Sequence, residues 1–284
     1  MNALISRNLK VFFRDRASVF FSLLAVLIIL GLYVLFLGDV MMQDFNGVSG
    51  AKALSDSWIM SGILAVISVT TVLGAFGTMV DDRAHKIIKD FSASPLSRGK
   101  LAGSYIVSSF VVGSVMTLLA FALSEIYIVA RGGTLLTLSQ TAEVMGLILL
   151  SALSNTAMLS FLVSFLKSQN AFGTASSLVG TLIGFLTGIY MPVGVLPEAM
   201  QAVVKVFPVS HAALLLRRIM MEAPMKAVFA GAPDAAAQSF RTQMGLSYSF
   251  GGTEIPAAVS IAILAGAALA FYALSIIRFS KKSK

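Results

Sequence analysis

The chain contains no cysteine, and charged residues make up only 12% of its 284 residues. Without thiols it forms no disulfide and has no thiolate for catalysis or metal binding. Soluble domains carry about 25% charged residues, whereas this chain is 57% hydrophobic and has a mean hydropathy of +0.88. The composition therefore excludes an ordinary soluble domain and predicts an integral membrane protein.

The short motifs of common catalytic and nucleotide-binding sites are also absent. The sequence has no Gly-x-x-x-x-Gly-Lys-Ser/Thr phosphate loop, no His-Glu-x-x-His and no Gly-x-Ser-x-Gly. The two histidines, His85 and His211, are far apart and lack the neighbours of a metal site. We therefore expect no enzyme, no metal and no cofactor in this chain. If this membrane protein transports a solute, the energy must come from another protein, or the transport is passive or ion-coupled.

The net charge of +8 raises the question of nucleic-acid binding. The basic residues, however, follow the ends of the apolar runs and do not form one patch, as membrane topology requires. Most of the 21 Lys and Arg residues fall in segments on one side of the membrane if the N-terminus is inside. We therefore expect no nucleic-acid partner, and a multi-pass protein of the cytoplasmic membrane with both termini cytoplasmic.

Several apolar runs have the roughly 17 to 25 residues that a helix needs to cross the hydrocarbon, and no alternating barrel segments occur. The first apolar run is of spanning length and lacks the small-residue cleavage site of a signal peptide. We therefore expect it to stay in the protein as the first membrane-spanning helix. The sequence predicts an all-α fold, with residues 1–284 forming a single transmembrane domain. The six expected membrane-spanning helices are residues 18–37, 58–80, 101–129, 143–166, 172–191 and 254–277.

The N-terminal segment, residues 1–16, has apolar and basic residues on opposite helical faces. The pattern predicts an amphipathic helix along the inner leaflet, with aromatic rings among the acyl chains and cations toward anionic lipids or an acidic partner. The alternative is a basic segment that only sets topology. The key residues are Arg7, Lys10, Phe12, Phe13 and Arg14.

Residues 81–100 form a polar, basic interruption between two apolar runs and are expected in the cytoplasm. Apolar residues at helical spacing give a short helix one apolar face before Pro95 ends it. Such a helix can transmit force from a soluble partner, although an ordinary positively charged loop is the simpler interpretation. The candidate docking residues are Lys86, Ile87, Ile88, Lys89, Asp90 and Phe91.

Residues 192–253 are expected on the external side of the membrane, and their first part is too apolar for an ordinary loop. Pro192 stops the fifth span, Pro197 suits the first turn of a new helix, and Pro208 closes that helix about three turns later. We predict a short helix that dips back into the outer leaflet.

A path for substrate is suggested by polar and aromatic residues in the second and fifth spans, although Ser and Thr in membrane helices more often bond to their own helix. Ion-coupled carriers usually bury charged groups near the bilayer centre, whereas the spans here offer mainly hydroxyls and Asn155. This difference weakens the interpretation as an ion-coupled carrier. The candidate path residues are Thr70, Thr71, Phe76, Thr181, Phe185 and Thr187.

Small residues recur every four positions in the fifth and last spans. Such stripes let helices approach closely, and packing within one subunit is favoured over a subunit interface. The stripes are Ser176, Gly180, Gly184 and Gly188, then Ala258, Ala262, Gly266 and Ala270.

The order of these parts resembles the type-2 family of ATP-binding cassette (ABC) exporter membrane subunits along nearly the whole chain. Three places carry the resemblance, and each motif alone is modest. They are residues 7–16, the end of the first cytoplasmic loop at 93–98 (Ala-Ser-Pro-Leu-Ser-Arg), and the external segment from Met191-Pro192 through Leu196-Pro197 and Phe207-Pro208 to Leu216-Arg217.

The resemblance implies that residues 86–91 are a coupling helix seated in a cleft of a separate ABC ATPase, which would bind ATP and Mg. The N-terminal helix would brace it, and a second copy or a homologue would complete the transporter. Substrate would move outward, with a hydrophobic or amphipathic small molecule as the default. An ion-coupled carrier or channel without an ATPase is the alternative, and a membrane assembly or signalling factor is a third.

Overall fold

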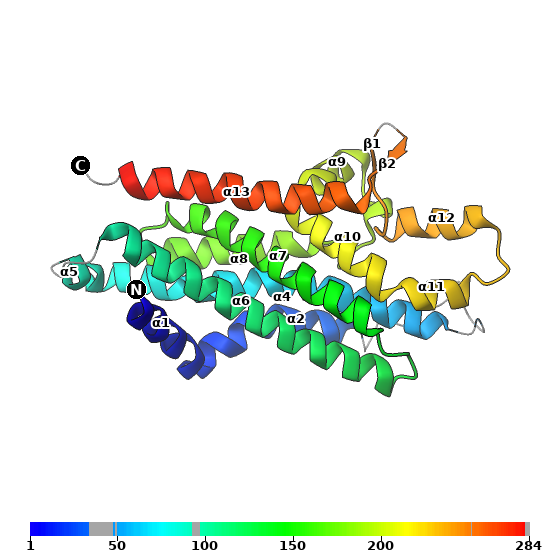
Figure 1. The fold of residues 1–284 in the computed structure, drawn as a ribbon, viewed down its shortest axis with the longest axis horizontal. Helices are drawn as coiled ribbons and strands as arrows, with labels where there is room; N and C mark the ends of the chain where they lie inside the picture. The colour runs from blue at the N-terminus through cyan, green and yellow to red at the C-terminus, as the bar shows by residue number, and fades with distance from the viewer. Residues whose placement is uncertain (34–47, 49, 93–96, 251, 282–284) are drawn as a thin grey trace.

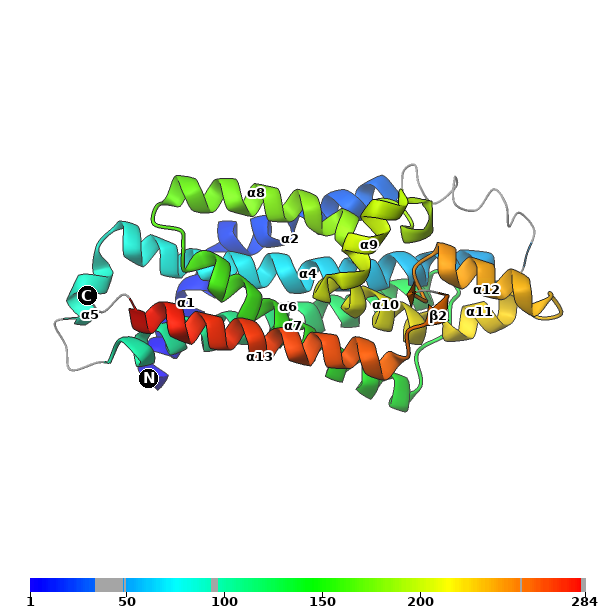
Figure 2. The ribbon, with the colours of Figure 1, turned by 90° about the horizontal axis from the view of Figure 1, so that it is seen from above.

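Figure 1 shows the computed structural model, which describes residues 1–33, 48, 50–92, 97–250 and 252–281. Its long helices run side by side along one axis, and the views in Figures 1 and 2 agree on this arrangement. We call one end of the bundle the α5 end, after the short helix α5 (Ile87–Ser92), and the other the hairpin end, after the strands β1 (Ser249–Phe250) and β2 (Thr253–Glu254). The described residues are helical almost throughout, so the predicted all-α class is confirmed.

Helix α4, Ala51–Ala84, is the centre of the bundle. It is apolar on every side, as expected of a helix surrounded by others, and Trp58, Leu64 and Phe76 are each at most 1% exposed. Around it pack α2 (Arg16–Leu32), α6 (Arg98–Ala130), α7 (Leu138–Val163), α8 (Gln169–Leu186) and α10 (Pro208–Met220). Helix α13 (Ala257–Lys281) packs mainly on α7 and α10.

Among the described residues, four helices are long and apolar enough to cross a membrane: α4, α6, α7 and α13. The pair α9 (Glu198–Val206) and α10, bent by 87°, would make a fifth. Helices α2 and α8 occupy the first and fifth predicted segments with 17 and 18 residues, and positions 34–37 of the first lie outside the described residues. The count of six spans therefore stays a prediction.

Several helix boundaries differ from those predicted, for identifiable reasons. Helix α4 begins at Ala51 and not at residue 58, and its additional first turns contain Asp56, which is 1% exposed and receives a hydrogen bond from Arg131 Nε at 3.1 Å. Helix α7 begins at Leu138 and not at 143, behind a capping box formed by Thr137 and Gln140. The added turns thus contain polar residues whose contacts hydropathy alone does not show.

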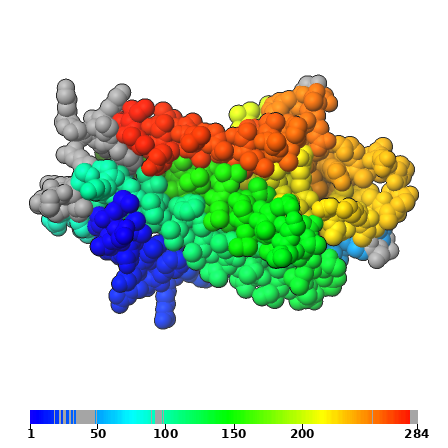
Figure 3. Space-filling view, viewed as in Figure 1, coloured from blue at the N-terminus to red at the C-terminus, as the bar shows by residue number. Residues whose placement is uncertain are grey.

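The α5 end, at the left of Figure 1, gathers α1 (Asn2–Arg14), α5 (Ile87–Ser92) and the last turns of α13. Helix α1 lies across the bundle axis, and Figure 3 shows it on the surface in blue. The hairpin end carries α11 (Glu222–Val228), α12 (Asp234–Gln243) and the antiparallel strands β1 (Ser249–Phe250) and β2 (Thr253–Glu254). The two ends therefore differ in structure.

The proline-rich segment lies between α8 and α10. Pro192 precedes the short 3-10 helix η3 (Val193–Val195), and Pro197 is the N-cap residue of α9. Helix α9 ends before Pro208, which is the first residue of α10. A short helix thus stands between the second and third prolines, while its membrane placement stays a prediction.

The small-residue stripe of α13 is exposed along its length, whereas we expected packing within the subunit. The buried side of α13 is instead formed by Ser260, Leu264, Ala268 and Ser275. In the stripe of α8, Gly184 makes room for the ring of Tyr190, because a Cβ atom on Gly184 would lie only 2.1 Å from Cε2 of Tyr190 in the same chain. Gly188, with a φ of +68°, follows the end of α8.

Candidate functional site

Asp82, at the last turn of α4, is a carboxylate buried at the α5 end of the bundle. Its exposed fraction is 1%. Arg7 of α1 contacts both of its oxygens, with Nη2 2.8 Å from Oδ1, and the Tyr105 hydroxyl of α6 donates to Oδ2 at 2.5 Å. Because a buried charge is costly unless paired and hydrogen-bonded, this cluster joins α1 and α6 firmly to α4.

The electrostatics of the pair favour its charged form. The hydrogen bonds that Arg7 donates to Asp82, together with the attraction between the two charges, raise the pKa of Arg7 above its already high ordinary value. Arg7 therefore remains a cation at any physiological pH. Its side chain is one third exposed, whereas that of Asp82 is 2% exposed, so the carboxylate depends most on the contact.

The two neighbours of Asp82 contact two further segments. Asp81 Oδ1 accepts a hydrogen bond from Gln169 Nε2 of α8 at 2.9 Å. Arg83 Nη1 donates to the carbonyl of Leu166, just after α7, at 2.5 Å. Three consecutive residues, 81–83, thus connect the end of α4 to α1, α6, α8 and the end of α7, and we call them the α4 base.

Helix α5 follows the α4 base after a sharp turn at Lys86, which has a φ of +62°. Ile88 and Phe91 are partly buried and pack against the main core, and Arg7 lies over the Phe91 ring, 5.8 Å from its centroid. The apolar face of α5, expected to point outward, is thus turned largely to its own bundle. Lys86 and Asp90 are exposed.

The remaining parts of this predicted loop are described unevenly. Ile87 is half-buried. The side chain of Lys89 and residues 93–96 of the first-loop motif lie outside the described residues.

Two residues of helix α1 that were predicted to face lipid or an acidic partner point into the bundle instead. Phe12 is 3% exposed and packs on Ala75, Val112 and Met116, so its ring lies in the bundle and not among acyl chains. Phe13 is 41% exposed. The cations divide as well, because Arg7 turns inward to Asp82 while Lys10 and Arg14 are exposed.

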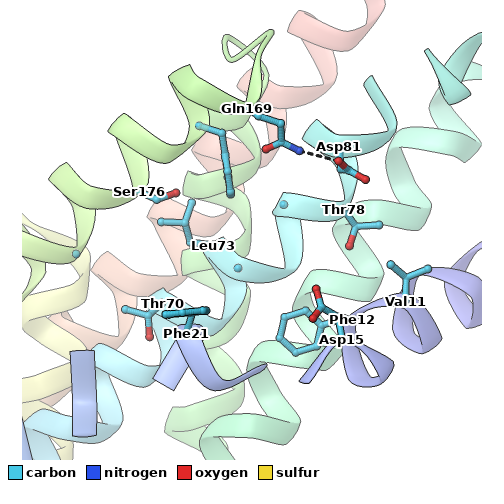
Figure 4. Close-up of a pocket in the computed structure, with 14 residues that line it drawn as sticks. Val11, Phe12, Asp15, Phe21, Thr70, Leu73, Thr78, Asp81, Gln169 and Ser176 are labelled. Atoms are coloured by element: carbon cyan, nitrogen blue, oxygen red, sulfur yellow. Dashed lines mark hydrogen bonds between the residues drawn. The ribbon is translucent and has the colours of Figure 1, made fainter. Parts of the chain in front are cut away.

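A pocket of about 550 Å³ opens between α8 and the α1–α2 segment, along one face of α4 (Figure 4). Asp81 and Gln169 lie on one side of it and Asp15 on the opposite side, with hydroxyls and rings between them. The α4 residues that line it share one face of that helix. Its lining is Val11, Phe12, Asp15, Phe21, Thr70, Leu73, Gly74, Gly77, Thr78, Asp81, Gln169, Phe172, Ser176 and Gly180.

Among the six residues predicted for a substrate path, Thr70 lines this pocket. Thr71 instead bonds the carbonyl of Ile67 at 2.6 Å, and Phe76 is fully buried in the core. Thr71 and Phe76 therefore do not line this pocket, because aromatic and hydroxyl content does not show which way each residue faces, and the substrate path itself stays a prediction.

The three path residues of the fifth segment lie away from the pocket. Thr181 and Thr187 bond the carbonyls of Ser177 and Ile183 within their own helix, at 3.0 and 2.8 Å. Phe185 is exposed and stacks edge-on against Tyr190.

Sequence reasoning missed several lining residues that a helical pattern would have found. Gly74, Gly77, Thr78 and Asp81 follow the predicted Thr70 at i+4, i+7, i+8 and i+11, which is a polar and small stripe along α4. No sequence pattern predicts Asp15 and Gln169 as lining residues, because they reach the pocket only through the packing of other helices against α4.

The hairpin end contains a second set of buried polar residues. Arg217 of α10 is fully buried, none of its nitrogens has a hydrogen-bond partner among the described residues, and its guanidinium carbon lies 4.9 Å from the Trp58 ring centroid. Both ring nitrogens of His211 have partners, Ser260 Oγ and the Lys205 carbonyl. Within the described ranges, no three His, Asp or Glu side chains gather as a metal site would require.

Residues 37–277 match the model of the family described as ABC-2 family transporter protein. The matched range contains α4 to α12 and most of α13, and therefore the α4 base and α5. No curated protein matches the chain.

Proposed function

This chain belongs to the ABC-2 family of transporters, and on that basis we propose that it is the membrane subunit of an ATP-driven exporter. The family supports an integral membrane transport subunit that is not itself catalytic. In the proposal, a separate ABC ATPase binds ATP with Mg and supplies the energy. Substrate moves outward across the cytoplasmic membrane.

The observation that carries the proposal is the connection between α5 and the α4 base. Helix α5 follows the α4 base within a few residues, and Phe91 of α5 lies against Arg7, the partner of Asp82. A displacement of α5 by an ATPase would therefore act on the ends of α4, α1, α6, α7 and α8 together. This is the connection that a coupling helix requires.

The placement in the membrane follows from the same assignment. The α5 end would face the cytoplasm, with both termini on that side, in agreement with the excess of Lys and Arg in the segments around it. The hairpin end would be external, and the bent pair α9–α10 would enter the outer leaflet from outside. Lys10 and Arg14, exposed on α1, would lie near anionic lipid headgroups.

The pocket between α8 and α1–α2 is the proposed substrate path. Its volume of about 550 Å³ is in the range of small-molecule sites, and its walls combine rings with hydroxyls. Beside it, α8 exposes Leu178 and Leu182 at 60% and 55%. We propose that a second permease subunit, a copy of this chain or a homologue, covers this face and completes the path.

Gentle purification of the tagged chain from its own host tests the ATPase partner. We expect a phosphate-loop ATPase in stoichiometric amount, and we expect Asp90→Lys to release it, because Asp90 is exposed on α5. Asp234→Lys is the matched control, since Asp234 is exposed at the hairpin end. Well-extracted protein without any ATPase would contradict the proposal, and flux in liposomes holding this chain alone would then support an ion-coupled carrier or channel.

A further inference from the structure

Helix α1 has two faces, and the bundle covers one of them. On the covered face, Asn8 is 4% and Phe12 is 3% exposed, and Phe12 packs on α4 and α6. The other face has three cations, Arg7, Lys10 and Arg14, at i, i+3 and i+7, so they form one row along the helix. We call this row the basic stripe.

We propose that the basic stripe is a binding site for an anionic phospholipid, and that the bound lipid holds α1 in the position where Arg7 reaches Asp82. This inference deepens the proposed placement of α1. It rests on the proposed function only in putting the α5 end at the inner leaflet. The charge of the stripe, the exposed rings near it and the position of Arg7 carry it.

The surface of the stripe has positive charge only. An open groove of about 640 Å³ runs along it, and its described lining is Ala3, Ser6, Arg7, Lys10, Val11 and Arg14. Lys10 and Arg14 are exposed, and neither forms an ion pair with a described carboxylate. Asp15, which follows α1, lines the pocket beside α4 and not this groove. A phosphodiester headgroup with a net negative charge is complementary to such a surface.

Exposed aromatic rings near the stripe indicate that the covering molecule has acyl chains. Phe13 of α1 and Phe20 and Phe21 of α2 are 41%, 51% and 66% exposed. Phe21 lines the pocket beside α4 together with Val11, which also lines the groove, so the two surfaces adjoin. An anionic lipid offers both a charged headgroup and acyl chains, whereas free phosphate or an acidic patch on a soluble protein offers no chains.

Arg7 connects the stripe to the α4 base. Its side chain is one third exposed, and its Nη2 lies 2.8 Å from Asp82 Oδ1. Its guanidinium also lies over the Phe91 ring of α5. A lipid that attracts Lys10 and Arg14 fixes the same helix from its outer side, so lipid binding and the Arg7–Asp82 contact favour each other. Anionic lipid would thus stabilise the connection between α1, the α4 base and α5.

Fluorescence quenching by brominated lipid tests the site on the full chain without any partner. Because the chain has no cysteine, Ser6→Cys gives a single labelling position in the groove. The bimane-labelled chain is placed in nanodiscs of phosphatidylcholine that contain increasing fractions of brominated phosphatidylglycerol or brominated phosphatidylcholine. We expect half-quenching at a fraction of phosphatidylglycerol at least about fivefold lower, since one cation near an anionic bilayer contributes about that factor. Added salt should reduce the difference.

Charge variants of the labelled chain locate the site. Lys10→Gln/Arg14→Gln removes two charges and keeps a good helix former at both positions. It is expected to abolish the difference between the two lipids. The control Lys52→Gln/Arg241→Gln removes the same charge from exposed cations at the hairpin end and should retain the difference. A label placed instead at Ser239→Cys, exposed on α12, should be quenched equally by both lipids.

Thermal unfolding tests whether the lipid holds α1 in place. Nanodiscs with phosphatidylglycerol should raise the unfolding midpoint of the unmodified chain by about 2 to 4 °C over pure phosphatidylcholine, because a ligand of the folded state stabilises it. Lys10→Gln/Arg14→Gln should lose this shift. Lys52→Gln/Arg241→Gln should retain it, which separates the stripe from a general effect of the charged bilayer.

Equal quenching by both lipids, or a preference for phosphatidylglycerol that persists in Lys10→Gln/Arg14→Gln, would overturn the lipid site. A preference without a shift in midpoint would overturn the effect on α1. Equal quenching together with loss of a co-purifying ATPase from the double variant would assign the stripe to an acidic protein. Conversely, lipid preference in a chain that purifies without any ATPase would support the stripe and contradict the exporter.

Discussion

Arg7 and Asp82 lie 75 residues apart in the sequence and form a bidentate ion pair at the end of the central helix. The pair fixes an amphipathic surface helix to the base of α4, beside the short helix proposed to receive the ATPase. Arg7 therefore serves mainly to hold α1 against α4, and only the exposed third of its side chain faces solvent or lipid.

The first prediction concerns the energetics of this pair. Arg7→Gln leaves Asp82 buried without its ion partner and should cost about 2 kcal/mol, which is below the range for fully buried pairs because Arg7 is partly exposed. Asp82→Asn keeps an acceptor for Tyr105 and should cost less. The double variant leaves no buried charge unpaired and should cost less than the sum of the two single variants, as measured by thermal unfolding in detergent, and fully additive costs would contradict the pairing.

The second prediction concerns the turn between α4 and α5. Lys86 has a φ of +62°, a region that L-residues occupy at a cost of about 1 kcal/mol and glycine occupies freely. Lys86→Gly should therefore retain the turn, while the β-branched Lys86→Val should disturb it and expose the turn to proteolysis. Limited digestion of the two variants measures this, and equal digestion rates would argue against a constrained turn.

A third prediction uses two glycines of α8 with opposite surroundings. At Gly184 an added Cβ atom would lie 2.1 Å from the Tyr190 ring, whereas at Gly180 it would meet nothing within 4 Å. Gly184→Ala should lower the unfolding midpoint, at a cost of about 1 to 3 kcal/mol. Gly180→Ala should leave it unchanged or raise it by helix propensity. The reverse order would show that α8 and Tyr190 do not pack closely.

Arg217 gives a fourth prediction, because its guanidinium is fully buried beside Trp58 and has no hydrogen-bond partner among the described residues. Replacing an unpaired buried charge by an apolar side chain of similar length removes a desolvation cost. Arg217→Met should therefore keep or raise the unfolding midpoint. Trp58 is the single tryptophan of the chain, so its fluorescence follows this site directly, and a large loss of stability would reveal a partner for Arg217.

The fifth prediction is a weak pH dependence at the hairpin end. Hydrogen bonds from Lys226 and Gln140, in that order, lower the pKa of Glu222. A carboxyl whose folded pKa is lowered stabilises the fold above its unfolded pKa, and this contribution is lost as the pH falls through the folded pKa. Glu222 is exposed, so the effect is small. The acid-induced drop in unfolding midpoint should be slightly smaller in Glu222→Gln, and an identical drop would contradict this assignment.

Much of the architecture follows from local properties of the chain. Long apolar runs must become helices in a membrane, because an unpaired backbone is too costly there. The helix limits at Pro197 and Pro208 follow from the ring of proline, which fixes φ and removes a donor. The amphipathic pattern of residues 1–16 and the helical spacing of residues 87–91 likewise identify α1 and α5 before any contact is known.

The sequence by itself thus determined the all-α class, the place of most long helices and which family the order of segments resembles, whereas α10, α11 and α12 lie in a stretch expected to be mainly an external loop. Only the tertiary structure decided that Arg7 faces Asp82, that Phe91 turns inward, and that Asp15 and Asp81 share a pocket. The physical reason is that helix formation depends on neighbours three or four residues away. The direction of a side chain depends instead on the packing of helices that are distant in sequence, and hydropathy carries no record of those contacts.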